Sequence, residues 1–179
     1  MISDKVRPAV LAAIEAKGYA GVTYEGVAAA SGVAKTTLYR HWPTKAELVF
    51  DLVVHGHDVH PLDCDPTVEG ASQALAARVA RFLGAGPAAR AVPAVLLDMT
   101  NDPVLAERLR TGVVAQGQVE VAQLLDRCGL DPIQGMDAGD VQMVLLGAAQ
   151  SWLTVAGLSV GEVESRLAIL ASTLLTARS

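Results

Sequence analysis

Two short helical segments separated by three residues constrain the fold of this chain more than any other feature. The first spans residues 23–31 and the second begins at Lys35, with Gly32 in the turn between them. Glycine adopts the tight or left-handed backbone conformation that lets two helices cross steeply at such a turn. A short helix pair joined by a glycine-containing turn of this length is the signature of a helix-turn-helix motif.

The second of these helices has two chemically distinct sides. Pro43 ends it at about Trp42, because proline disfavours the α conformation in the residue before it. At roughly 100° per residue, Leu38 and Trp42 share the side that faces the core. The opposite side carries hydroxyls and a cation without an acid: Thr36, Thr37 and Arg40, edged by Lys35, Tyr39 and His41. Such side chains reach base edges and phosphates in a major groove, so the pattern favours DNA binding.

The remaining chain also has helical periodicity. Val6, Val10 and Ile14 share one face of a first helix, and Thr44–Glu47 and Ser159–Glu162 are capping boxes that begin later ones. Further helices are expected at about 67–83, after Pro87 with a kink or break at Pro93, at 102–128, at 137–156 and at 160–177. Since β-branched alternation is absent, no sheet is expected. The sequence predicts an all-α protein.

A polar segment bounded by prolines, His55–Pro66, predicts a domain boundary. We expect an N-terminal three-helix helix-turn-helix DNA-binding domain over residues 1–54, with a fourth helix continuing to about residue 60 as a connector. Residues 55–179 would then form a larger helical body. This division places the short helix pair in its own small module.

Charge and composition agree with an intracellular DNA-binding protein. The net charge of −5 combines about +2 in residues 1–50 with about −7 in the rest, and no acid occurs from Gly26 to Ala46. A cationic stretch on an otherwise acidic chain is typical of a surface that binds a polyanion. Only two cysteines are present, and the charged first seventeen residues do not resemble a signal peptide. We therefore expect a cytoplasmic location.

The N-terminal segment resembles the DNA-binding domain of the TetR family of transcriptional regulators. The resemblance runs without a gap over about residues 6–53 and rests on Gly18-Tyr19, Thr23, Val27-Ala28, Ser31-Gly32-Val33 and the run from Lys35 to Leu48. It implies that residues 55–179 form a helical ligand-binding and dimerisation bundle. It also implies a homodimeric repressor that binds a palindromic operator in double-stranded DNA and is released by a small-molecule effector.

The resemblance also implies roles for individual residues. Tyr39 and Lys45 would hold phosphates, and Thr23 would contact a phosphate while capping its helix. Base-edge or adjacent backbone contacts would come from Lys35, Thr36, Thr37 and Arg40, with His41 at the margin. Ala34 departs from the family, whose members often carry a capping hydroxyl there. Because a lost cap costs about 1 kcal/mol, we expect the second helix to fray without DNA.

The same resemblance places the dimer interface on the last two helices. Its expected contributors are Leu146, Leu153, Leu167, Leu170 and Leu174. Residues 141–161 lack charge, but recurring polar residues and acidic flanks argue against a membrane span. Mid-helix residues with adaptable bulk or polar heads are the effector-site candidates: Phe82, Met99, Gln116, Gln150 and Trp152. The scarcity of charge predicts an apolar effector, neutral or weakly cationic.

Two alternatives remain at this stage. The first is a metal-responsive regulator that uses the His55–Cys64 segment, although its ligand spacing matches no familiar site, so no bound metal is predicted. The second is a helical ligand-binding protein without sequence-specific DNA readout. An enzyme is not expected, since the sequence contains no glycine-rich phosphate loop, nucleophile elbow or paired carboxylate motif. No cofactor is expected either.

Overall fold

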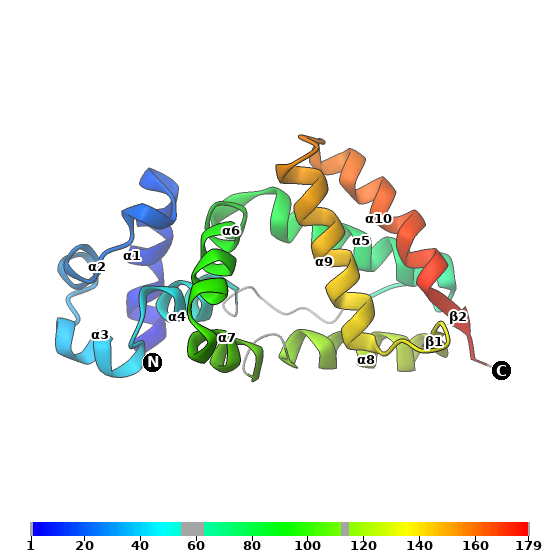
Figure 1. Ribbon diagram of the computed structural model, residues 1–179, viewed down its shortest axis with the longest axis horizontal. Coiled ribbons are helices and arrows are strands. Elements are labelled where there is room, and N and C mark those ends of the chain that lie inside the picture. The colour runs from blue at the N-terminus through cyan, green and yellow to red at the C-terminus, as the bar shows by residue number, and fades with distance from the viewer. Residues whose placement is uncertain (1, 55–62, 112–114, 179) are drawn as a thin grey trace. The chain divides into compact units, whose positions relative to one another are not determined.

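The computed structural model describes residues 2–54, 63–111 and 115–178, whose regular secondary structure is helical apart from two short strands (Figure 1). The chain divides into two compact units. One contains Met1–Asp58 and Gly86–Val113, and the other contains Val59–Ala85 and Val114–Ser179. The N-terminal helices thus share a unit with two helices from the middle of the chain. The expected functional boundary near residue 54 stays a prediction.

The first unit is built around its N-terminal helix. Its elements are α1 (Ile2–Lys17), the 3₁₀ turn η1 (Tyr19–Gly21), α2 (Tyr24–Ser31), α3 (Lys35–His41), α4 (Lys45–Val49), the π-helical turn η2 (Phe50–Val54), α6 (Gly86–Asn101) and α7 (Pro103–Leu109). Val6, Val10 and Ile14 are fully buried, as their spacing predicts. The face they form lies against α2, α6 and η2. Gly18, at φ 64°, follows the last residue of α1.

The second unit consists mainly of four helices. Its elements are α5 (Val68–Gly84), α8 (Ala115–Cys128), β1 (Leu130–Pro132), α9 (Ala138–Thr154), α10 (Val160–Leu174) and β2 (Leu175–Ala177). The pair α5 and α10 forms its core, where Leu75 and Leu167 are almost fully buried. Helices α9 and α10 run in opposite directions on either side of a short connection (Figure 1). The predicted capping box from Ser159 to Glu162 begins α10.

The middle of the chain differs from the sequence expectation in two places. Helix α6 continues through Pro93 instead of breaking there. Pro93 lies on an exposed side of the helix, where water can bond the carbonyl that loses its helical partner. The single helix expected at 102–128 is two helices, α7 and α8. Asp102 caps α7, and proline occupies the first helical position.

A small antiparallel sheet, which the sequence did not predict, closes the second unit. Strand β1 pairs with β2, and Leu130 lies opposite Ala177. Leu130 and Leu175 are buried, while Arg178 forms ion pairs with Asp126 and Asp131 beside the strands. Three residues per strand are too few to show an alternating pattern. The last helix consequently ends at Leu174 and not near Ala177.

The close approach of α5 and α10 gives a test of the packing in the second unit. A Cβ added at Gly84 would lie 2.5 Å from a methyl carbon of Val160, which a real contact does not allow. We expect Gly84→Ala to lower the free energy of unfolding by about 1–3 kcal/mol, measured by urea denaturation. Gly161→Ala is the control, because a Cβ there meets open space. Equal stability of the two variants would contradict this packing.

Candidate nucleic-acid interface

The helix-turn-helix pair forms as the sequence predicts. Thr23 caps α2, its side-chain oxygen accepting a hydrogen bond of 3.1 Å from the backbone N–H of Gly26. Gly32 follows α2 in the left-handed conformation at φ 70°. A non-glycine residue is strained in that conformation, so the turn depends on this glycine. The prediction of a short, steep turn is confirmed.

Helix α3 is held by two side chains on its inner face. Leu38 is fully buried and Trp42 is 5% exposed, and the indole N–H of Trp42 donates a 2.7 Å hydrogen bond to Asp51. Burial of one leucine side chain contributes about 1.5–3 kcal/mol. These two anchors set the rotation of α3 about its axis. Ala34, at the N-cap, provides no side-chain hydrogen bond.

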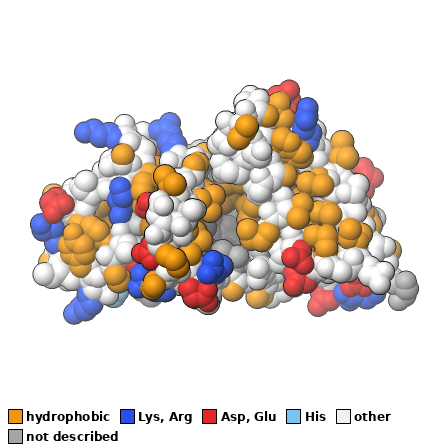
Figure 2. All heavy atoms as spheres, viewed as in Figure 1, with side chains coloured by type: hydrophobic (Ala, Val, Ile, Leu, Met, Phe, Trp, Pro, Cys, Tyr) orange, Lys and Arg blue, Asp and Glu red, His pale blue; other side chains and the backbone are white. Residues whose placement is uncertain are grey.

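The outer face of α3 is open to solvent. Thr36, Arg40 and His41 are exposed, Tyr39 is 48% exposed, and Thr37 is half-buried. Among the described residues, Arg40 has no ion-pair partner. Lys and Arg side chains lie at the surface near this end of the unit (Figure 2). Of the outward positions predicted from helical geometry, Thr36, Arg40 and His41 are thus open to solvent.

Tyr24, which the sequence reasoning missed, supports this face from beneath. Its ring stacks on that of Tyr39 with centroids 3.9 Å apart, and its hydroxyl donates a 2.5 Å hydrogen bond to the carbonyl of Trp42. Burial, and secondarily the neighbouring Tyr39 and Glu47, raises the pKa of Tyr24 to about 12. The hydroxyl therefore remains a donor at neutral pH. It ties α2 to the end of α3 and limits where the Tyr39 ring can go.

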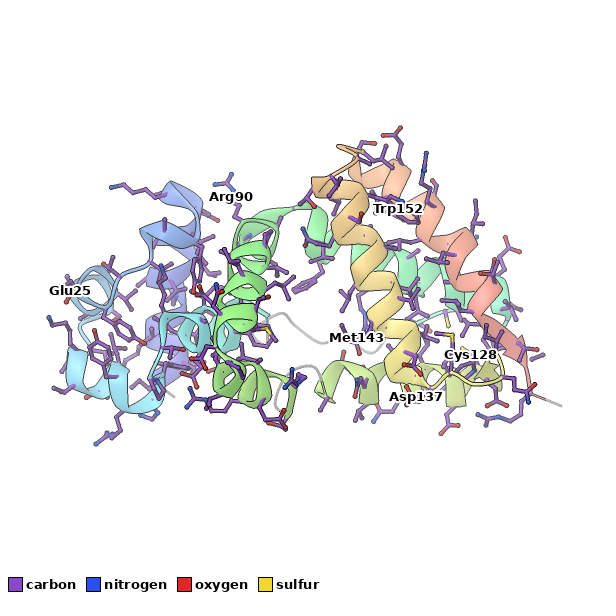
Figure 3. All side chains as sticks on the ribbon, viewed as in Figure 1. Glu25, Arg90, Cys128, Asp137, Met143 and Trp152 are labelled. Atoms are coloured by element: carbon purple, nitrogen blue, oxygen red, sulfur yellow. The ribbon has the colours of Figure 1, made fainter. Side chains whose placement is uncertain are left out.

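Lys35 is paired with an acid that lies outside the acid-free stretch of the sequence. Its Nζ is 2.8 Å from a carboxylate oxygen of Glu25, and both side chains are mostly exposed. Glu25 lies on α2 (Figure 3). The hydrogen bond from Lys35 lowers the pKa of Glu25 below its usual range. An exposed ion pair adds little stability and is screened by salt. Lys35 can exchange this partner for a phosphate at small cost.

Lys45 occupies the first position of α4. The preceding Thr44 forms the predicted capping box with Glu47. The Nζ of Lys45 lies 4.1 Å from the ring centroid of Tyr19, and the Tyr19 hydroxyl donates to Asp98 on α6. Burial and that hydrogen bond raise the pKa of Tyr19. A cation and the free N–H groups of a helix start favour an anion here.

Helices α6 and α7 contact the elements that carry the interface. The guanidinium of Arg108 on α7 lies 3.0 Å from Glu47, the residue that completes the α4 capping box. On α6, Arg90 donates a hydrogen bond to the carbonyl of Glu15 in α1. With the Tyr19–Asp98 bond, these contacts join two mid-chain helices to α1, η1 and α4. The sequence contained no local signal for them, because the partners are far apart along the chain.

The predicted dimer residues differ in exposure. Leu146, Leu153 and Leu170 are half-buried, whereas Leu167 is fully buried and Leu174 is 8% exposed. The last two belong to the core of their own unit and have little surface to offer a partner. Other apolar residues of α9 and α10 are open to solvent: Met143, Val144 and Ile169.

The predicted effector residues do not all belong to one unit. Phe82, Gln150 and Trp152 are half-buried in the second unit, while Met99 is half-buried in the first. The side chain of Gln116 lies outside the described part of the structure. Nothing in the structure assigns these residues to a common site, and their role stays a prediction.

The structure describes only part of the His55–Cys64 segment, the candidate for a metal site. His55, His57, Asp58 and His60 lie outside the described residues, and Asp63 and Cys64 lie within them. No cluster of three metal-binding side chains occurs in the described part of the chain. Within that same part, no helix combines the length and apolar character that crossing a bilayer requires.

These features define a helix-turn-helix protein with a free, acid-poor recognition helix. Residues 9–52 match the family of bacterial regulatory proteins known as the tetR family. Over 130 residues the chain is 26% identical to uncharacterized HTH-type transcriptional regulators of Mycobacterium tuberculosis and Mycobacterium bovis. The match covers 72% of this chain, which spans 59% of the length of those relatives. The match to the tetR family model is confined to residues 9–52, and the relatives that match over a longer stretch are themselves described as transcriptional regulators.

Solved structures share the fold of the whole chain. A TetR transcriptional regulator from Rhodococcus sp. RHA1 is 22% identical, with a TM-score of 0.67 over 96% of this chain and 94% of that one. NalD of Pseudomonas aeruginosa, the secondary repressor of the MexAB-OprM multidrug efflux pump, is 19% identical, with a TM-score of 0.60 over 98% and 96%. The flavonoid-responsive regulator FrrA is 23% identical, with a TM-score of 0.51 over 96% and 93%. The all-helical architecture predicted from the sequence is confirmed.

The uncapped start of α3 gives a test of how firmly this helix is held. Ala34 is exposed and has the extended backbone of an N-cap, so a serine there can accept a hydrogen bond from the first turn. We expect Ala34→Ser to raise the free energy of unfolding by about 0.5–1 kcal/mol, measured by urea denaturation.

Ala29→Ser is the matched control for this substitution. Ala29 is also exposed, but it lies inside α2, where a serine caps nothing and is a poorer helix former. This substitution should leave the free energy of unfolding unchanged or lower it slightly. A stabilisation by Ala29→Ser as large as that by Ala34→Ser would show that the cap is not the cause.

Proposed function

We propose that this chain is a repressor that binds a palindromic operator as a homodimer and is released by a small apolar effector. The observation that carries DNA recognition is the rotation of α3, whose buried Leu38 and Trp42 leave Thr36 and Arg40 outward. Arginine recognises guanine with two hydrogen bonds in the major groove, and threonine contacts bases through its hydroxyl or methyl group. Each subunit would place α3 in a major groove.

The residues around α3 fit the phosphates on either side of that groove. In this proposal Tyr39 and Lys45 bind phosphates, Thr23 adds a contact from the start of α2, and Lys35 leaves Glu25 for the DNA backbone. Thr37 and His41 complete the contacts at the edges of α3. Phosphate contacts fix the position of a protein on DNA, while base contacts select the sequence. Two half-sites would lie about 34–36 Å apart or a multiple of that distance.

The exposed apolar side chains of α9 and α10 support the proposed homodimer. Met143 is 47% exposed and Ile169 is 68% exposed, and hydrophobic side chains gather over these two helices (Figure 2). Small residues, Gly147 and Ser151, lie on the solvent side of α9 and allow close helix approach. We assign the interface to this face, with Leu146, Leu153 and Leu170 at its edge. Leu167 and Leu174 act from the core beneath it.

The contacts of α6 and α7 support release by an effector. The Tyr19–Asp98 bond and the Arg108–Glu47 ion pair join these helices to the elements around Lys45. A ligand that binds one position of α6 more tightly than another shifts the equilibrium toward that position. Such coupling is reciprocal and is typically about 1–3 kcal/mol. The fold neighbour FrrA is flavonoid-responsive, which agrees with a largely apolar effector.

Selection from random duplex DNA tests the proposed function most directly. Enrichment of an inverted repeat whose half-sites follow the spacing above would support a dimeric, sequence-reading regulator. Failure to enrich any sequence would favour the alternative of a helical ligand-binding protein without DNA readout. Metal analysis of protein purified without an affinity tag tests the alternative of a metal-responsive regulator.

Arg40 and Lys45 are expected to affect DNA binding differently. Arg40→Ala should weaken binding to the selected operator by about 1–3 kcal/mol and relax the preference at one base position. Lys45→Ala should weaken binding to all duplexes about equally. It should also reduce the slope of log affinity against log salt concentration by about one. Both are measured by fluorescence anisotropy at several salt concentrations. The control is Arg81→Ala, an exposed arginine of α5 whose loss should change neither quantity.

Ile169 tests the proposed dimer face. We expect Ile169→Lys to produce monomers at micromolar concentration in sedimentation velocity, because it places a charge in an apolar interface. Val104→Lys is the matched control, since Val104 on α7 is 65% exposed and Ile169 is 68% exposed. It should leave the dimer intact. A monomeric parent protein, or two equally dimeric variants, would exclude this face.

A further inference from the structure

The two cysteines of the chain lie next to each other. Cys64 and Cys128 are 64 positions apart in sequence, yet their Sγ atoms are 3.1 Å apart. Cys64 precedes α5, and Cys128 is the last residue of α8 (Figure 3). Both are free thiols, and both are partly exposed. The DNA-binding proposal gives this pair no role.

The local backbone allows the two sulfur atoms to come closer. A disulfide bond has an S–S length of about 2.0 Å, so the pair must shorten its separation by roughly 1 Å. Cys64 lies in a segment without helix or strand, and Cys128 is followed by Gly129 in the left-handed conformation at φ 62°. Neither cysteine lies in the middle of a helix, where the shift would be opposed by hydrogen bonds on both sides.

We propose that Cys64 and Cys128 are a redox site, which forms a reversible intramolecular disulfide on reaction with a hydroperoxide. Disulfides that form in reducing compartments are usually transient and redox-sensing. Partial exposure gives a small oxidant access to the sulfur atoms and later gives a reductant access to the bond. The site is independent of the proposed DNA contacts.

The two sulfur atoms have different parts in the reaction. Burial, followed by the hydrogen bond and the charge of Cys128, raises the pKa of the Cys64 thiol to about 11. Cys64 therefore keeps its proton at neutral pH, and the first attack is assigned to Cys128. Its thiolate attacks one oxygen of hydrogen peroxide, breaking the O–O bond and leaving a sulfenic acid and hydroxide.

The second step joins the two cysteines. The Cys64 sulfur attacks the sulfenic sulfur of Cys128, expelling hydroxide, while the Cys64 proton and the proton first lost from Cys128 convert the two hydroxides to water. In total, two thiols and one hydrogen peroxide give one disulfide and two waters. The sulfur atoms lose two electrons and the peroxide gains them. A small dithiol reverses the change by thiol–disulfide exchange.

The test uses the whole purified chain, reduced and then treated with hydrogen peroxide. Free thiols are blocked with iodoacetamide, and the intact mass and proteolytic peptides are measured. We expect a species lighter by two hydrogens, with no alkylated cysteine and with the Cys64 and Cys128 peptides joined. Its yield should not depend on protein concentration, and dithiothreitol should restore both thiols. The thermal midpoint should rise by about 5–10 °C, because the bond closes a long loop.

Cys64→Ser and Cys128→Ser are the control variants, with circular dichroism to establish that each is folded. In each variant the remaining thiol should stay reduced or be oxidised irreversibly. The thermal midpoint should show no reversible shift. The proposal fails if the parent protein keeps both thiols after treatment, forms only links between chains, or ends mainly as sulfinic and sulfonic acids. These outcomes leave the DNA-binding proposal unaffected, since none of them involves α3.

Discussion

The inward anchoring of α3 is the constraint on which the whole interface depends. A helix of seven residues has too few internal hydrogen bonds to be stable alone, so tertiary contacts must fix it. Leu38 and Trp42 are four positions apart and therefore lie on one side of the helix. Once both are buried, Thr36 and Arg40 must face outward. The Tyr24 hydroxyl then holds the carbonyl at the end of α3, which limits fraying at that end.

Features that depend on neighbours within a few residues could be predicted from the sequence. The cap at Thr23, the turn at Gly32 and the capping box from Thr44 are of this kind, and all three are present. The stacking of Tyr24 on Tyr39 and the pairing of Glu25 with Lys35 were missed. They join different helices across the steep turn, and no spacing rule relates positions on two helices whose crossing is not yet known. The same limit hid the contacts of α6 and α7 with the N-terminal elements.

The second unit shows a different limit of sequence reasoning. Residues 141–161 carry no charge, so hydrophobic periodicity cannot distinguish the face of α9 that packs internally from the face open to solvent. Leu167 and Ile169 are both apolar and only two positions apart, yet one is fully buried and the other is 68% exposed. The tertiary structure alone separates a core residue from a candidate interface residue here. The predicted set of leucines consequently mixed the two kinds.

The internal partners of the cations have a consequence for the proposed recognition of DNA. Lys35 is paired with Glu25, and Lys45 lies over the Tyr19 ring, whereas Arg40 has no ion-pair partner in the described part of the chain. Nonspecific binding consists of phosphate contacts, so under the proposal every duplex would displace the weak partners of the two lysines. Base recognition by Arg40 requires no such exchange. In the proposed complex these internal contacts would therefore weaken binding to all DNA by the same amount and would leave the free-energy difference between operator and other sequences intact. A regulator that must leave most of a genome unoccupied gains from that arrangement, because the operator keeps its advantage while competing sites hold less protein.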